Sequence, residues 1–193
     1  SGGDISLTAT GGDVILRDAV ATNNGNFSAT TITSGYFNNS GSDDSSITTG
    51  TGSVTISTVG SSGGVGADLG RINAGSLNVT TSGGRIRQST TDADRYLAIT
   101  GTASFNANSF AIDLSNTQNN MQGAISLTTT GIGNNATLQN RAETTILGAV
   151  STGGTLDITA DHDLTLNGDV TTTGTTLNFG ANIAAPTASP STF

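Results

Sequence analysis

Apolar and polar residues alternate along most of the chain in short runs. The segment Ile5-Ser-Leu7-Thr-Ala is typical, because aliphatic residues alternate with hydroxyl-bearing ones and a glycine-containing turn follows. A period of two places successive side chains on opposite faces of a β-strand. The pattern therefore predicts short strands that have one aliphatic face and one face of Thr, Ser or Asn.

The same unit recurs throughout the sequence. Residues 5–14 match residues 77–86 in chemical type, position by position, and residues 156–164 follow the same scheme with one turn residue fewer. Copies begin about 25 residues apart on average, at Ile5, Phe27, Val54, Leu77, Leu97, Ile125, Leu156 and Leu177. Self-similarity at this period indicates a repeat architecture in which each unit buries its apolar face against its neighbours.

Stacking of equivalent strands predicts a single all-β domain over residues 1–183, a parallel β-helix (β-solenoid) of about eight coils that rise about 4.8 Å each. The longer units are expected to carry loop excursions at residues 34–46, 60–70, 115–122 and 131–142, which are rich in Gly, Asn, Ser and Asp. Residues 184–193 hold both prolines and are expected to form a tail or linker. An antiparallel sandwich is the alternative. It is disfavoured because a sandwich has no reason to repeat its turns in phase with its hydrophobic pairs.

The composition restricts which folds and which partners are possible. Thr, Gly, Ser and Asn number 35, 27, 22 and 18 among the 193 residues, which disfavours helix and leaves material for only a thin core. The formal charge is −8, and such an acidic, aromatic-poor surface would repel a phosphate backbone, so we expect no nucleic-acid partner. No apolar run approaches the roughly 20 residues that span a bilayer, so membrane insertion is not expected. The absence of Cys excludes disulfides and thiolate metal sites.

Several stretches resemble a known family. The segments NMQGAISLTTTG (residues 120–131), ILGAVSTGGTLDITA (146–160) and DLTLNGDV (163–170) are similar to the repeats of filamentous-haemagglutinin-like bacterial adhesins of the two-partner-secretion type. In that family, long exported proteins form right-handed β-helices on the cell surface. The resemblance implies a right-handed parallel β-helix, an extracellular location and an adhesive role. The Asn-Pro-Asn motif of the family's secretion module has no counterpart, since the two prolines are Pro186 and Pro190, so the chain resembles the shaft.

One charged cluster is the best candidate for catalysis. Arg85 and Arg87 flank Ile86 and should project together from the outer face, and Asp92, Asp94 and Arg95 follow closely in sequence. Some β-helix enzymes cleave polysaccharides with Asp, Arg or a bound cation. The alternative is a solvated cluster whose charges offset one another. We favour this alternative because sugar-cleaving enzymes normally present aromatic platforms and the chain has no Trp, and we expect no catalytic residue and no cofactor.

The only histidine, His162, lies between two aspartates, which invites a metal or acid–base role. The repeat alignment instead places it where other copies have Gly11-Gly12 and Gly83-Gly84, and this predicts an exposed turn residue. Asp-rich turns invite a Ca²⁺ site, but the glycine-aspartate nonapeptide of calcium-binding β-rolls is absent from the sequence. No metal site is expected.

Three classes of function remain. The first, which we favour, is a non-enzymatic extracellular rod, a shaft of a bacterial surface adhesin or biofilm-matrix protein that contacts glycans, matrix polymers or a host surface. The second is a subunit of a self-assembling fibre, in which copies stack through open β-helix ends. The third, least favoured, is a polysaccharide-cleaving β-helix enzyme.

Overall fold

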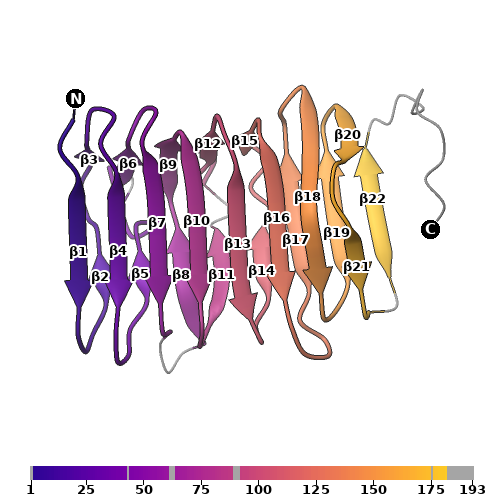
Figure 1. Cartoon of the computed structure of the whole chain (residues 1–193), viewed down its shortest axis with the longest axis horizontal. Coiled ribbons are helices and arrows are strands. Elements are labelled where there is room, and N and C mark those ends of the chain that lie inside the picture. Colours follow the sequence, from indigo (N-terminus) through magenta and orange to yellow (C-terminus); the bar gives the residue numbers. More distant parts are fainter. Residues whose placement is uncertain (1, 43, 61–63, 89–91, 175, 182–193) are drawn as a thin grey trace.

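The computed structural model describes the chain except for residues 1, 43, 61–63, 89–91, 175 and 182–193. The described residues form strands joined by turns and contain no helix, so the all-β prediction is confirmed. Successive strands lie side by side along a rod, with β1 at one end and β22 at the other (Figure 1). The fold is the parallel β-solenoid that the repeating pattern predicted, with about seven turns where the sequence predicted about eight.

Three sheets form the sides of the solenoid, and every pairing between named strands is parallel. Sheet A contains β1 (Ile5–Ala9), β4 (Phe27–Thr31), β7 (Ser53–Thr58), β10 (Ser76–Thr81), β13 (Ala103–Asn108), β16 (Ala124–Thr129), β18 (Thr144–Thr152), β20 (Asp163–Leu166) and β21 (Val170–Thr172). Sheet B contains β2 (Val14–Ile15), β5 (Phe37–Asn38), β8 (Val65–Leu69), β11 (Arg85–Gln88), β14 (Ile112–Leu114), β17 (Ala136–Asn140), β19 (Leu156–Ala160) and β22 (Leu177–Ala181). Sheet C contains β3 (Val20–Ala21), β6 (Ser46–Thr48), β9 (Arg71–Ala74), β12 (Leu97–Ile99) and β15 (Asn120–Met121).

The turn count and the loops differ in part from the sequence prediction. Five of the predicted starts occupy one inward column of sheet A: Ile5, Phe27, Val54, Leu77 and Ile125. Leu97, however, belongs to sheet C, and Leu156 and Leu177 belong to sheet B, because strands of all three sheets share the same alternation. Each of the four expected loop excursions also contains a strand, namely β5, β8, β15 and β17. The expected tail at residues 184–193 lies outside the described residues.

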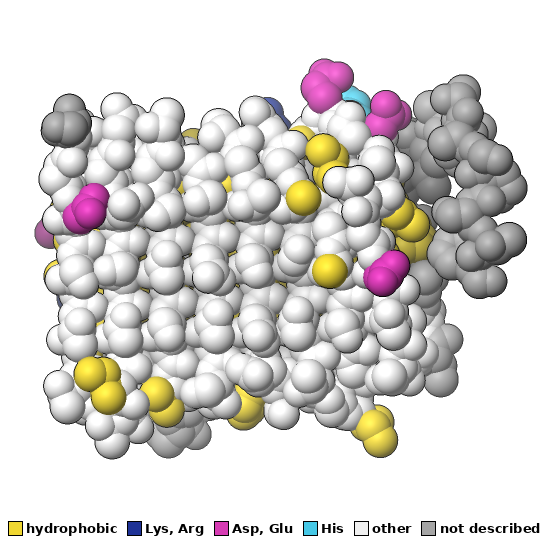
Figure 2. Space-filling view, viewed as in Figure 1, with side chains coloured by type: hydrophobic (Ala, Val, Ile, Leu, Met, Phe, Trp, Pro, Cys, Tyr) yellow, Lys and Arg dark blue, Asp and Glu magenta, His cyan; other side chains and the backbone are white. Residues whose placement is uncertain are grey.

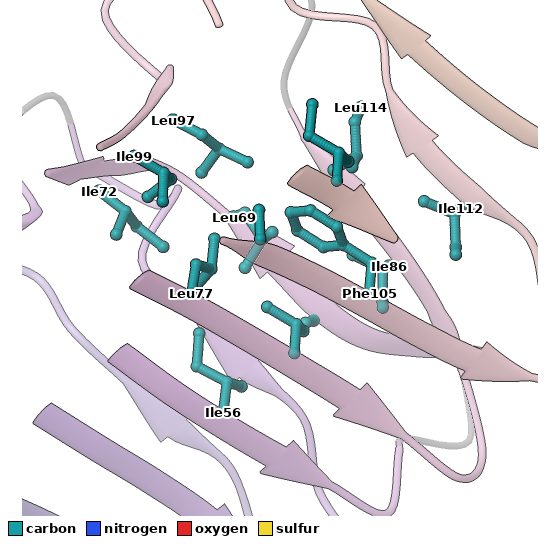
Figure 3. Close-up of a cluster of buried hydrophobic side chains, with 14 of the residues drawn as sticks. Ile56, Leu69, Ile72, Leu77, Ile86, Leu97, Ile99, Phe105, Ile112 and Leu114 are labelled. Atoms are coloured by element: carbon teal, nitrogen blue, oxygen red, sulfur yellow. The ribbon is translucent and has the colours of Figure 1, made fainter. Parts of the chain in front are cut away.

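The core is a narrow column of aliphatic side chains that point inward from all three sheets. Figure 3 shows this packing in the middle turns, where Leu77 and Phe105 of sheet A meet Ile86 and Ile112 of sheet B, and Ile72 comes from sheet C. All five residues are at most 2% exposed. Complete burial of one such side chain stabilises a fold by about 1.5–3 kcal/mol, so the stack supplies the main driving force for folding.

Buried threonines occupy the corner where sheet A turns into sheet B. The hydroxyl groups of Thr31, Thr58 and Thr81 each donate a hydrogen bond to the carbonyl of a glycine that follows on the way to or at the start of sheet B. The Thr129 hydroxyl donates to the Asn134 carbonyl and accepts a hydrogen bond from the Gly153 amide of the next coil. These bonds satisfy backbone groups at the bend, where the sheet ladder cannot reach them.

Glycines occupy the corner where the chain re-enters sheet A, because adjacent coils approach closely there. A Cβ atom on Gly52 would lie 2.1 Å from the Gly25 carbonyl oxygen, and one on Gly123 would lie 2.2 Å from the Gly101 carbonyl oxygen. A larger residue at either position would force the coils apart.

Buried amides occupy the corner between sheets B and C, and one of them closes sheet C. The Asn140 side chain accepts a hydrogen bond from the Met121 amide at 2.8 Å and donates one to the Met121 carbonyl at 3.0 Å, so it pairs with β15 as a neighbouring strand would. The Asn39 side chain makes the same pair of hydrogen bonds with the next coil: it accepts one from the Gly70 amide and donates one to the Arg71 carbonyl. Beyond Asn140, residues 141–143 lead directly into β18, so the solenoid narrows from three sides to two.

We expect Ile158→Asp to unfold the neighbouring coils. Ile158 is completely buried on β19, and an unpaired buried charge costs several kcal/mol. The matched control is Thr159→Asp, because Thr159 is half-buried on the outward face of the same strand and the change should be tolerated. Urea denaturation monitored by circular dichroism measures both variants. Equal losses at the two positions would contradict the inward register.

We expect Asn140→Leu to lower the free energy of unfolding by about 2–4 kcal/mol, because it leaves the buried amide and carbonyl of Met121 unpaired. The control is Gln139→Leu, whose side chain is half-buried on the outward face and should change stability by less than about 0.5 kcal/mol. Thermal and chemical unfolding measure the difference. A loss no larger than that of the control would show that Asn140 does not cap sheet C.

Candidate functional site

The charged cluster predicted from the sequence separates into two ion pairs. Arg87 points outward from β11 and contacts Asp68 on β8 of the neighbouring coil, with Nη2 and Nε at 2.6 and 3.0 Å from the same carboxylate oxygen. The Asp68 side chain is 11% exposed and the Arg87 side chain 40%. The sequence analysis missed Asp68, because β8 was expected to be part of a loop and the partner is distant in sequence. Arg85, two residues before Arg87, is exposed.

The second pair joins Asp92 and Arg95 in the segment before β12. Arg95 Nε donates to Asp92 Oδ2 at 2.7 Å, and the Asp94 amide donates to Asp92 Oδ1 at 2.9 Å. Asn116 of the next coil donates to the Asp92 carbonyl at 2.9 Å. Asp92 therefore holds the conformation of its own turn. Both ion pairs therefore have a structural role: Asp92 and Arg95 stabilise one turn, and Arg87 and Asp68 join two neighbouring coils.

His162 lies in the bend between β19 and β20, and its neighbours Asp161 and Asp163 are also exposed. This bend connects a strand of sheet B to a strand of sheet A. The repeat alignment had instead matched His162 to Gly11-Gly12, which follow a strand of sheet A. Within the described residues, no group of three His, Cys, Asp or Glu side chains is placed to hold a metal ion.

A surface hollow of about 690 Å³ lies where sheet C ends. It exists because residues 141–143 connect β17 to β18 without a third side, so the space that a further strand of sheet C would fill stays open. Its lining consists of Asn120, Gln122, Arg141, Ala142, Glu143, Thr144, Asp161 and His162. In Figure 2 the histidine and the acidic side chains beside it stand at this edge of the rod. We call this feature the step hollow.

Most of the residues that line the step hollow are polar. They include two carboxylates, those of Glu143 and Asp161, and one guanidinium, that of Arg141, and all three residues are exposed. Arg141 Nη1 donates a hydrogen bond to Gln118 Oε1, a residue that does not line the hollow. The sequence analysis missed this site, because the lining residues come from three coils and depend on where sheet C stops.

The outer face of sheet A is broad and uncharged. Its outward residues form two columns of small polar side chains: Ser6, Ser28, Thr55, Asn78, Ser104 and Ser126 in one, and Thr8, Thr30, Ser57, Thr80, Asn106, Thr128 and Ser151 in the other. Strands β4 to β18 of this sheet contain no charged residue, although the chain has 14 acidic and six basic residues. Figure 2 shows this face as a continuous surface with its acidic side chains near the ends.

Comparison with known proteins finds one family of repeats that matches part of the chain, and that family has no assigned activity. Residues 51–128 match the model of a family described as repeats of unknown function (DUF5649), and this segment extends from β7 into β16. No curated protein and no solved structure matches the chain. The described residues also contain no helix that is long and apolar enough to cross a membrane.

We expect Arg87→Gln to lower the free energy of unfolding by about 1 kcal/mol, because Asp68 would keep its charge in a nearly buried position without its cation. Partial exposure of Arg87 keeps the loss modest. The control Arg85→Gln should change stability by less than about 0.5 kcal/mol. Urea denaturation measures both variants, and equal midpoints would show that the ion pair contributes nothing.

Proposed function

We propose that this chain is a segment of a non-enzymatic extracellular rod, a structural or adhesive shaft of a bacterial surface protein or secreted biofilm matrix. The observation that carries the proposal is the outer face of sheet A, which presents hydroxyl and amide side chains at every coil over an interior filled with aliphatic residues. A regular polar surface on a rod favours many equivalent shallow contacts. The sequence resemblance to adhesin repeats supports the extracellular location.

The chemistry of this face indicates the class of partner. Hydroxyl and amide groups donate and accept hydrogen bonds without charge, so they suit glycans, matrix polymers or a host surface of similar chemistry. Each contact remains exposed to water and is therefore weak. Useful strength then requires many rods on one surface, because linked sites raise avidity by about 10²–10⁴ over a single contact.

The charged residues support the non-enzymatic proposal. Asp68 and Asp92 are held in ion pairs with Arg87 and Arg95, and the cluster is divided between the outer face of sheet B and the turn before β12. A hydrolase or lyase needs an acid and a base that converge on one bond. The hydrogen bonds of these two carboxylates are made with neighbouring protein groups.

A second candidate is a self-assembling fibre whose subunits stack end to end. The specific observation is the partial exposure of residues packed against the core in the first and last described coils, namely Ile5 and Leu7 at one end and Leu164 and Val170 at the other. A second copy in the same parallel register would cover them, as would further coils of a longer chain. Electron microscopy of the purified chain separates filaments from isolated short rods.

We expect the monomeric chain to bind bacterial cells, host cells or glycan-coated surfaces poorly, and the same chain clustered on beads to bind well, because avidity replaces affinity. Bead retention at increasing surface density measures the effect, and beads coated with the unfolded Ile158→Asp variant are the control. Retention that does not depend on density would contradict the proposal.

The enzyme alternative has its own test. The purified monomer is incubated with acidic and neutral polysaccharides and the release of reducing ends is measured, with a variant in which Arg85, Arg87, Asp92 and Asp94 are all Ala as the control. We expect no depolymerisation by either protein. Cleavage that disappears in the folded fourfold variant would replace the rod proposal with an enzymatic one.

A further inference from the structure

We infer that the step hollow binds a saccharide unit through its neighbouring hydroxyl groups. This inference rests on the proposed function, because it assigns the adhesive rod one specific binding site in addition to its repeated face. The site consists of Asn120 in β15, Gln122 directly after it, residues 141–144 and the bend at Asp161 and His162. Its volume of about 690 Å³ lies within the range of small-molecule sites.

The hollow does not accept an added β-strand. A strand would need free backbone groups on the outer edge of β15, but the Met121 amide and carbonyl are both hydrogen-bonded to the Asn140 side chain. The Asn119 carbonyl, one residue before β15, accepts a hydrogen bond from the Arg141 amide at 2.8 Å. A ligand in the hollow is therefore recognised by side chains.

The side chains select for hydroxyl groups. The carboxylates of Glu143 and Asp161 accept strong charge-assisted hydrogen bonds from O–H donors. The amides of Asn120 and Gln122 provide both donors and acceptors at the same site. Adjacent hydroxyl groups on a sugar ring present this alternation of donors and acceptors at short spacing.

The same lining disfavours other ligands. Two carboxylates against one guanidinium repel phosphates and polyanions, and Ala142 is the only apolar residue in the lining. Among the described residues that line the hollow there is no Phe, Tyr or Trp, so a sugar ring finds no broad apolar platform there. Binding should therefore be weak, with a Kd on the order of 1 mM, which suits a rod that gains strength from clustering.

The test is a titration of the ¹⁵N-labelled chain, followed by amide chemical shifts, with lactose, cellobiose or maltose as separate probes. We expect at least one of them to shift the amides of residues 141–144 and 161–162. Glu143→Gln and Asp161→Asn should each weaken this binding about tenfold, because a charge-assisted hydrogen bond is lost. The matched control is Asp157→Asn, which neutralises a half-buried carboxylate on the outward face of β19, outside the hollow, and should bind as the unaltered chain does.

Three outcomes would overturn the inference: no shift with any of the three sugars, shifts confined to other residues, or shifts at the hollow that both variants retain at full strength. Shifts caused by a lysine-rich peptide and by no sugar would also overturn it and assign the carboxylates to a cationic partner. The bead assay separates this inference from the proposed function. If no sugar binds the step hollow but clustered chains are still retained by cells or matrix, the inference fails and the rod proposal stands. If clustered chains are not retained, the proposed function itself fails.

Discussion

Parallel, in-register hydrogen bonding between successive coils is the constraint on which the rest of the structure depends. Coils stacked about 4.8 Å apart must present the same backbone geometry at every level, so inward positions become columns such as Ile5, Phe27, Val54 and Leu77. Each residue inside the column is covered on both sides by an equivalent one, whereas Ile5 at the end is covered on one side only. Stability is therefore built from nearest-neighbour contacts, and a defect in one coil is felt first by the two coils beside it.

The corners show what this stacking requires where the ladder is interrupted. Thr129 satisfies backbone groups with its hydroxyl, Asn140 replaces a missing strand with its amide, and Gly52 leaves space for the adjacent coil. These three residue types are abundant in the chain for a structural reason. The buried hydroxyl of Thr129 and the buried amide of Asn140 do not oppose folding, because both are hydrogen-bonded inside the rod.

The surface divides into parts with different chemistry. Sheet A presents an uncharged lattice, whereas the ion pairs of Arg87 and Arg95 lie on sheet B and before β12. The step hollow adds a third kind of surface, at the single point among the described coils where three sides become two. In the proposed rod, the lattice provides repeated weak contacts and the step hollow provides one selective contact.

The sequence by itself determined the all-β class, the stacking of repeats and the inward register of residues such as Leu127 and Ile158, because a period-two pattern is local and is visible in any short segment. It did not determine which sheet each strand joins, so Leu97 and Leu156 were aligned with strands of another side. It also missed the Asp68–Arg87 pair and the step hollow. Those features depend on where each coil turns and on how many sides it has, and only the pairing of segments distant in sequence decides that.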